Sequence, residues 1–312
     1  MELNILTWNI NFINNCWKKR IKCINKLIKK RNDYDIIALQ EVTIPFNEDI
    51  KNIYTFVNDM DYKYDTFFAR KIIYKWLNYC FPKKEIIKNI FNYMMDKLLI
   101  IISFIMSIFG NKLANFFINY GFIGKIVTGF FVLLFPFIFI FAWSFFGMLT
   151  LIKKNKIKAN IIKKEIFNGR SIQYSEFKYN SRDILFINVH LSYKNEKKQK
   201  KDELKKLLNF IKDKKKDIVL IAGDLNFEEN TKMYKILKKN KYKSLMCEKF
   251  GIEKKTYPSR KPKKCLDYIW VYGDNIKIKN INLVGSKKHS DHLGIEATII
   301  INKKYQVTKK KV

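Results

Sequence analysis

The chain has 312 residues, 48% of them hydrophobic, and a formal net charge of +33. This length suits one large domain or two small ones, and the apolar content is ample for a core. Five cysteines, an odd number without a CxxC pair, argue against a disulfide framework or a zinc site and suit a reducing compartment: Cys16, Cys23, Cys80, Cys247 and Cys265.

The basic excess is large, with 61 Lys and Arg against 28 Asp and Glu. Such a surface attracts nucleic acid, anionic lipid headgroups or phosphorylated substrates. Only six of the 61 are Arg, the residue preferred for bidentate contacts with phosphates and bases. A lysine excess beside abundant Asn and Ile is typical of coding bias, so the charge alone selects no partner.

The first forty residues predict a strand, a helix and a second strand. Leu3–Trp8 is a strand that ends at Asn9 and leaves no room for a cleavable signal peptide. Asp35–Leu39 is a second buried strand, and Glu41 follows its end. Between them, apolar residues recur at helical spacing among lysines: Trp17, Ile21, Ile24 and Ile28. This order predicts a layered α/β arrangement.

Residues 71–146 differ in character from the rest of the chain. From about 71 to 97, mixed basic and apolar residues could form an amphipathic helix on a membrane surface. Two hydrophobic runs follow, at about 98–123 and 126–146, and the second continues to residue 152 without a charge. Because about 20 apolar residues cross roughly 30 Å of hydrocarbon, we predict a membrane insertion.

Two alternatives stay open for the second run. It could be a buried core helix, and its end, Gly147–Ile152, could be a strand of the catalytic domain. If groups before and after the insertion act together, the insertion must cross the bilayer an even number of times or dip in and return. Lysines at both flanks place the catalytic side in the cytosol. The predicted organisation is one catalytic domain (1–70 with 147–304), an insertion (71–146) and a basic tail (305–312).

The second half places further polar groups at strand ends. Asp183–Leu191 is a buried strand with His190 near its end, and a charged helix over 195–216 follows. The next strand, DIVLIAGDLN, ends in Asp224 and Asn226, whose spacing of two projects both side chains from one edge. The plainer alternatives are a satisfied core histidine and an Asx turn.

Three more polar residues lie near the C-terminus. Asp267 is embedded in the apolar strand Leu266–Val271, and a buried carboxylate needs a hydrogen-bond donor or a cation. Asp291 and His292 are adjacent in KHSDHLG, directly before the mostly apolar strand Ile295–Ile301. A Ser/Asp turn cap is the alternative for that segment.

Six motifs in this order resemble the endonuclease/exonuclease/phosphatase superfamily, the fold of deoxyribonuclease I: WNIN, QEV, NVHL, GDLN, LDYIWV and SDH. The resemblance covers most of the chain outside the insertion. It implies a four-layered α/β sandwich, two central β-sheets flanked by helices. It also implies cleavage of a phosphate ester with a divalent metal, usually Mg²⁺ and alternatively Mn²⁺. Between Phe68 and Met148 the chain departs from the pattern, because the insertion replaces a region where members often carry further active-site residues.

The same resemblance implies the metal ligands. Glu41 would be the principal ligand, with Asn9 beside it. Mg²⁺ keeps several waters and takes few protein carboxylates, so one Glu suffices. Asp291 would be a further carboxylate on the metal side or just outside the ligand shell.

The resemblance also implies the catalytic groups. Asp224 would position or deprotonate the attacking water, and Asn226 would hold that water or a phosphoryl oxygen. His190 and His292 would stabilise charge in the transition state. Asp267 would bond His292, fix its tautomer and raise its pKa. Either Asp224 or His292 could be the general base.

Two substrates fit this chemistry. A membrane-bound lipid phosphodiesterase similar to neutral sphingomyelinases is favoured by the insertion and by the two histidines, with the bilayer and a phospholipid as partners. A DNA or RNA nuclease is favoured by the net charge of +33 and is the alternative. An inositol-polyphosphate phosphatase has no signature here. We prefer the lipid, although a fold does not imply a substrate.

A catalytically inactive membrane scaffold is the hypothesis from another class. The presence of every polar residue in the six motifs argues against it, because a degenerate enzyme should have lost at least one. No protein partner is inferable. The terminal KKKV resembles a dilysine retrieval signal for the endoplasmic reticulum, which chance explains nearly as well in a lysine-rich chain.

Overall fold

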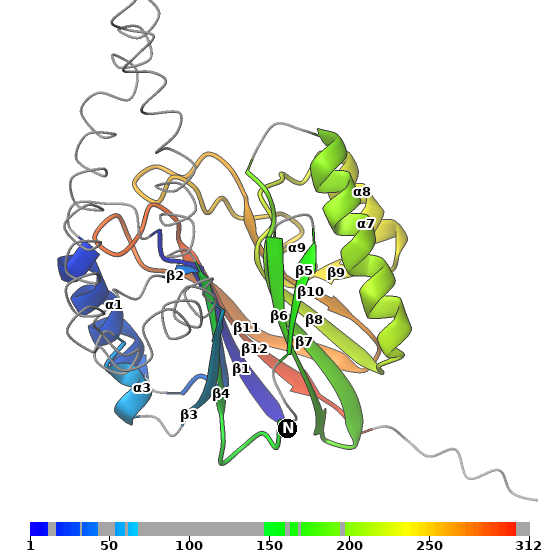
Figure 1. Cartoon of the computed structure of the whole chain (residues 1–312), viewed down its shortest axis with the longest axis horizontal. Coiled ribbons are helices and arrows are strands. Elements are labelled where there is room, and N and C mark those ends of the chain that lie inside the picture. Colours follow the sequence, from blue (N-terminus) through cyan, green and yellow to red (C-terminus); the bar gives the residue numbers. More distant parts are fainter. Residues whose placement is uncertain are drawn as a thin grey trace, which may run out of the picture.

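The computed structural model describes residues 1–11, 17–31, 33–42, 54–59, 62–67, 147–159, 163–167, 170–193 and 197–303. Within these ranges the strands form two six-stranded sheets that face each other (Figure 1). The first sheet contains β1 (Glu2–Asn9), β2 (Ile36–Val42), β3 (Tyr62–Phe67), β4 (Gly147–Lys153), β11 (Ile276–Val284) and β12 (Gly294–Ile301). The second contains β5 (Lys163–Phe167), β6 (Arg170–Tyr179), β7 (Arg182–His190), β8 (Ile218–Asp224), β9 (Lys243–Ser244) and β10 (Asp267–Tyr272).

Helices cover the outer face of each sheet (Figure 1). Helices α1 (Trp17–Arg31) and α3 (Phe56–Asp59) lie on the first sheet, and α7 (Lys197–Lys214) and α8 (Lys232–Lys239) lie on the second. The short helix α9 (Leu245–Phe250) instead buries Leu245 and Met246 in the core between the sheets. The fold is therefore the expected α/β sandwich of two central sheets flanked by helices.

The strand order brings the polar strand ends together. The first sheet runs β11-β12-β1-β2-β4-β3 and the second β5-β6-β7-β8-β10-β9. In each sheet the central pair, β1 with β2 and β7 with β8, is parallel. Because parallel strands end at the same edge, the residues after these strands meet at one edge of the sandwich.

The inner faces of the central strands change character along their length. Leucine, isoleucine and phenylalanine side chains fill the space between the sheets near the amino-terminal ends of the parallel strands. Alternation of side chains then places polar residues on the same faces near the carboxyl ends. The inward series are Leu3, Ile5, Thr7, Asn9 in β1; Ile184, Phe186, Asn188, His190 in β7; and Ile218, Leu220, Ala222, Asp224 in β8.

Gly223 allows β7 and β8 to approach just before Asp224. Its φ is +149°, and a Cβ there would lie 1.9 Å from the carbonyl oxygen of Val189. We expect Gly223→Ala to lower the free energy of unfolding by about 3 kcal/mol or more, because the added Cβ would clash with backbone atoms, which cannot move aside as a flexible side chain can. Denaturant unfolding measures this.

Gly251 provides the matched control for that substitution. It has φ +75° but no atom within 4 Å of a built Cβ. Gly251→Ala should therefore cost only the backbone strain, about 1 kcal/mol. Equal losses in the two variants would show that the contact with Val189 is unimportant.

The strands predicted around the motifs are present, with ends shifted by a few residues. Of the two interpretations of Gly147–Ile152, the structure shows the strand, β4, paired with β2 and β3. Among the described residues, no helix is long and apolar enough to span a bilayer. The whole insertion 71–146, with its runs 98–123 and 126–146, and the tail 305–312 lie outside the described residues, so the insertion and the domain boundaries stay predictions.

Candidate active site

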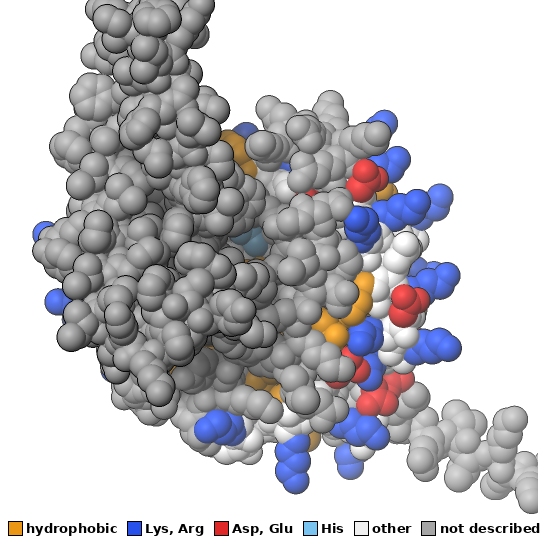
Figure 2. Space-filling model, viewed as in Figure 1, with side chains coloured by type: hydrophobic (Ala, Val, Ile, Leu, Met, Phe, Trp, Pro, Cys, Tyr) orange, Lys and Arg blue, Asp and Glu red, His pale blue; other side chains and the backbone are white. Residues whose placement is uncertain are grey.

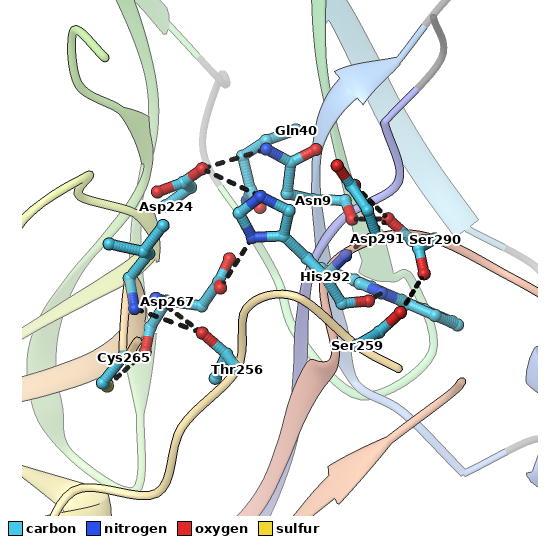
Figure 3. Close-up of polar contacts among 12 residues, drawn as sticks. Asn9, Gln40, Asp224, Thr256, Ser259, Cys265, Asp267, Ser290, Asp291 and His292 are labelled. Atoms are coloured by element: carbon cyan, nitrogen blue, oxygen red, sulfur yellow. Dashed lines mark hydrogen bonds and ion pairs between the residues drawn. The ribbon is translucent and has the colours of Figure 1, made fainter. Parts of the chain in front are cut away.

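The polar residues gather from both sheets at the edge where the parallel strands end (Figure 3). In the strand registers, Asn9 is opposite Gln40 in the first sheet, and Asp224 is opposite both His190 and Asp267 in the second. His292 precedes β12, and its ring lies between the two groups (Figure 3).

Asn9 joins the two sheets. Its Nδ2 donates to Glu41 Oε1 and to Asp224 Oδ2, each at 3.0 Å. Its Oδ1 accepts from the backbone N–H of Asn11 at 3.0 Å, which fixes the amide orientation. The side chain is fully buried. A carboxylate from each sheet is therefore held by one amide.

Glu41 reaches this edge through an unusual backbone conformation. Strict alternation along β2 would turn its side chain away from Ala38, which faces the core between the sheets. Glu41 instead has φ +51°, and the pairing of β2 with β4 shifts register between Leu39 and Val42. This bulge directs the carboxylate toward Asn9.

Asp267, His292 and Asp224 form a buried series. His292 Nδ1 lies 2.9 Å from Asp267 Oδ2, and Nε2 lies 3.9 Å from Asp224 Oδ2. Burial lowers the pKa of His292, but the charge and hydrogen bond of Asp267, with Asp224 and Asp291, raise it to about 10. An imidazolium at neutral pH can donate from Nε2, on the side of the ring that faces Asp224.

Asp224 is a buried carboxylate whose pKa is raised to about 7, chiefly by burial and next by the charge of Asp267. His292 and the hydrogen bond from Asn9 oppose this shift. The backbone N–H of Asn226 donates to Oδ1 at 2.9 Å, which fixes the orientation of the carboxylate. A base whose pKa lies near neutrality is well matched to taking a proton from water.

Asp267→Asn should lower the pKa of His292 from about 10 toward or below its ordinary value, because burial then acts with less opposition. A raised pKa in the folded state stabilises the fold below pH 6.5 and loses that effect as pH rises through 10. The stability difference between wild type and variant should therefore shrink as pH rises through that window. NMR titration of the imidazole and unfolding at pH 6 and pH 10 check both statements; an unchanged His292 pKa would contradict them.

The other predicted residues take distinct places. His190 Nε2 lies 3.7 Å from both Glu41 Oε1 and Asp224 Oδ2, so it lies beside the carboxylates that Asn9 joins. Asn226, at φ +53°, donates from Nδ2 to the carbonyl of Leu191. Its backbone N–H donates to Asp224 Oδ1, so the Asx turn, which was the plainer alternative for this motif, is present. Asp291 accepts from Ser290 Oγ at 3.4 Å.

A layer of supporting residues holds the site, and sequence reasoning did not select them. Thr256 Oγ1 accepts from the N–H groups of Leu266 and Asp267, and Ser290 Oγ donates to the carbonyl of Asn9 (Figure 3). Trp8 Nε1 donates to the carbonyl of His292. Trp8 in WNIN and Ser290 in SDH were signalled by their places beside Asn9 and Asp291, whereas Thr256 has no comparable signal.

The side chains present fit a divalent cation. Three carboxylates meet here, and Asp267 Oδ1 is buried without a hydrogen-bond partner among the described residues. Ligand atoms of Asp224, Asp267 and His292 lie within 4.8 Å of one another. His292 is paired with Asp267, however, and an imidazolium has no lone pair to offer. Glu41 would therefore be the better holder, since carboxylate oxygens suit hard cations such as Mg²⁺; Asn9 turns its Nδ2 toward Glu41, and its Oδ1 accepts from the N–H of Asn11.

Comparison with known proteins decides the family. The profile of the Endonuclease/Exonuclease/phosphatase family matches residues 6–292. The chain belongs to this family. Members are usually dependent on divalent metals, and the family indicates a hydrolase of phosphate esters.

Solved structures agree with this family at the level of the fold. Humanized D. rerio TDP2 is 13% identical, with 96% of this chain and 99% of that chain covered and a TM-score of 0.60. A family protein from Leptotrichia buccalis is 17% identical, with 96% and 100% covered and a TM-score of 0.59. D. rerio TDP2 complexed with single-strand DNA product is 13% identical, with 96% and 99% covered and a TM-score of 0.59. No curated protein matches the chain.

Proposed function

We propose that this protein is a metal-dependent phosphodiesterase that uses Mg²⁺, with Mn²⁺ as an alternative. The carrying observation is the contact of Asn9 with both Glu41 and Asp224, which joins carboxylates of the two sheets beside two histidines. Hydrolysis of a phosphodiester needs an activated water, donors for anionic oxygens and a cation. This edge offers residues for each.

The chain's own residues supply the proton chemistry. Asp224 accepts a proton from the attacking water, since its pKa lies near 7 and Asn9 and Asn226 fix its oxygens. His292, protonated and held by Asp267, donates toward a phosphoryl oxygen or the departing alkoxide. His190 lies beside Glu41 and Asp224 and provides a further donor. A divalent cation held by Glu41 and Asn9 would supply positive charge for the anionic oxygens of the phosphate.

The first candidate substrate is a phospholipid with a phosphodiester headgroup, as for neutral sphingomyelinases. Its support is the run 126–146, which carries no charge and directly precedes β4 in the sequence. An attachment to the membrane with the site facing the cytosol, in the endoplasmic reticulum or elsewhere, belongs to the same proposal. The run would then keep the active site close to the lipid headgroups.

Nucleic acid is the second candidate. D. rerio TDP2, which shares the fold, has been crystallised with a single-strand DNA product. Lysines are also abundant on the surface: on α7, Lys201, Lys205, Lys206 and Lys212 are exposed. Figure 2 shows the basic side chains of that side interleaved with acidic ones, which weakens the field that a polyanion would meet.

One assay separates these candidates. Detergent-solubilised full chain with Mg²⁺ is offered sphingomyelin, single-stranded DNA and duplex DNA side by side, with Asp224→Ala as the control for contamination. Release of phosphorylated headgroup without DNA cleavage supports the lipid. DNA cleavage without lipid turnover replaces it with the nuclease. No turnover of any phosphodiester would favour the inactive scaffold.

A further inference from the structure

A layer of uncharged polar side chains crosses the space between the sheets directly beneath the site. The rest of the interface between the sheets is mostly apolar. The members of the layer are fully buried and come from both sheets: Thr7, Gln40, Thr150, Gln173 and Asn188.

Gln40 and Asn188 are the centre of this layer. Gln40 Nε2 donates across the interface to Asn188 Oδ1 at 2.8 Å and, within its own sheet, to Thr7 Oγ1 at 3.1 Å. Asn188 Nδ2 donates back to the first sheet, to the carbonyl of Leu39 at 3.2 Å and to Thr150 Oγ1 at 3.1 Å. Asn188 therefore both donates and accepts between the sheets, whereas Gln40 only donates across the interface, and its Oε1 is buried without a hydrogen-bond partner among the described residues.

A second crossing lies beside the first. Thr150 Oγ1 donates to Gln173 Oε1 at 2.7 Å, which joins β4 to β6. The layer thus ties β1, β2 and β4 of the first sheet to β6 and β7 of the second. Apolar packing has no preferred direction, whereas hydrogen bonds fix distance and orientation. The layer limits sliding of one sheet on the other.

The layer lies next to the catalytic residues in sequence as well as in space. Thr7 precedes Asn9 by two residues on one strand face, and Asn188 precedes His190 in the same way, a separation of about 7 Å. Gln40 directly precedes Glu41 and is the register partner of Asn9. A shift between the sheets here would move Glu41 and Asn9 relative to Asp224 and so break the contacts of Asn9.

We propose that Gln40 and Asn188 are positioning residues, which align the two sheets so that Asn9 and Glu41 meet Asp224 and His190. The role is distinct from stabilisation, because buried polar groups often add specificity of arrangement rather than net stability. The inference rests on the proposed function for its catalytic consequence, but its structural content can be tested in protein that shows no turnover.

The test uses near-isosteric apolar variants, Gln40→Met and Asn188→Leu, alone and combined. Each single variant leaves one buried amide without its partner across the interface, so the melting temperature should fall by a few degrees. The double variant removes both amides, so its melting temperature should recover toward wild type. Tyr34→Phe is the control. It removes a 2.7 Å hydrogen bond to Glu296 next to the amino-terminal end of β2, whereas Gln40 lies near the carboxyl end of that strand.

Three readouts follow the alignment of the site. Titration calorimetry with Mn²⁺ should show binding weakened by about 10- to 100-fold in the singles and equally in the double variant, the range known for residues behind metal ligands. The value of kcat on a phosphodiester should fall by a similar factor. The imidazole NMR signals of His190 and His292 should shift in the double variant and not in Tyr34→Phe.

The outcomes separate this inference from the proposed function. If the stability of the double variant recovers while its Mn²⁺ affinity, kcat and histidine signals stay altered, the positioning role is supported. Recovery of all of them in the double variant overturns it and leaves a purely structural layer. If wild type neither binds Mn²⁺ nor hydrolyses a phosphodiester, the proposed function fails. The histidine signals then decide the inference: shifted signals support it, and unchanged signals overturn it.

Discussion

Replacing Asp224 with asparagine is expected to lower kcat for phosphodiester hydrolysis by about 10²- to 10⁴-fold, the usual range for a removed general base. The substitution preserves the size of the side chain and an oxygen that can accept from Asn9 or Asn226, so the loss would reflect the missing proton acceptor. Steady-state kinetics at saturating substrate measure it. Asp202→Asn, an exposed change on α7, is the matched control.

The same substitution should stabilise the fold at neutral and higher pH. The pKa of Asp224 is raised in the folded protein, so folding is favoured while the carboxyl is protonated, and that advantage is lost as pH rises from 3.8 through about 7. Asparagine carries no charge to bury. In the presence of a chelator, Asp224→Asn should therefore gain stability relative to wild type between pH 4 and pH 8. An unfolding free energy that falls equally in both proteins would contradict the assigned pKa shift.

Glu41→Gln is the second substitution with a large expected effect. Removing its charge should weaken Mg²⁺ or Mn²⁺ binding by about 100-fold or more, because even residues behind metal ligands cost up to that factor. The carboxamide keeps the contact with Asn9 available, so Asn9 stays in place to bond Asp224 across the sheets. Calorimetry with Mn²⁺ measures the affinity directly.

The two variants should also respond differently to added metal. Activity of Glu41→Gln should rise with metal concentration, since weak binding is overcome by mass action. Activity of Asp224→Asn should not, because the missing group acts on the proton. Glu248→Gln, an exposed change on α9, is the control. A Glu41→Gln enzyme with wild-type metal affinity would move the metal to the group of Asp224, Asp267 and His292.

Many of the strands that carry site residues could be predicted, because the polar residues continue the inward-facing series of buried apolar residues at the same spacing of two. Strands such as β7 and β8 are almost continuous apolar runs, as expected for parallel strands covered on both faces. Each of these strands then ends in a polar residue, which the burial of the strand does not require. The pairing of Asp267 with His292 was implied by the family resemblance and is confirmed by the 2.9 Å contact. The buried carboxylate alone predicted only a hydrogen-bond donor or a cation as its partner.

Edge strands were harder to anticipate. β11 carries Lys277 and Lys279 between isoleucines, and its residues are largely half-exposed or exposed. β5 is short and contains three charged residues in five. Such strands are defined by their neighbours in the sheet, and local sequence gives little sign of them.

The contacts of individual site residues depended on the backbone and on distant partners. Glu41 turns inward only because of its left-handed conformation and the bulge in β2, and no residue type in QEV requires that. Gln40 and Asn188 are 148 residues apart, so their contact could not be seen along the chain. Asn226 was expected to hold a water or phosphoryl oxygen, yet its amide donates to the carbonyl of Leu191.

The most direct test of the account is the metal dependence of turnover on a simple phosphodiester. Full chain in detergent should hydrolyse bis(p-nitrophenyl) phosphate with Mg²⁺ or Mn²⁺, lose that activity with a chelator, and regain it when metal is restored. Asp224→Asn should stay inactive throughout. Turnover that is equal with and without chelator, or unchanged in Asp224→Asn, would contradict the assignment of this edge as a metal-dependent phosphodiesterase site.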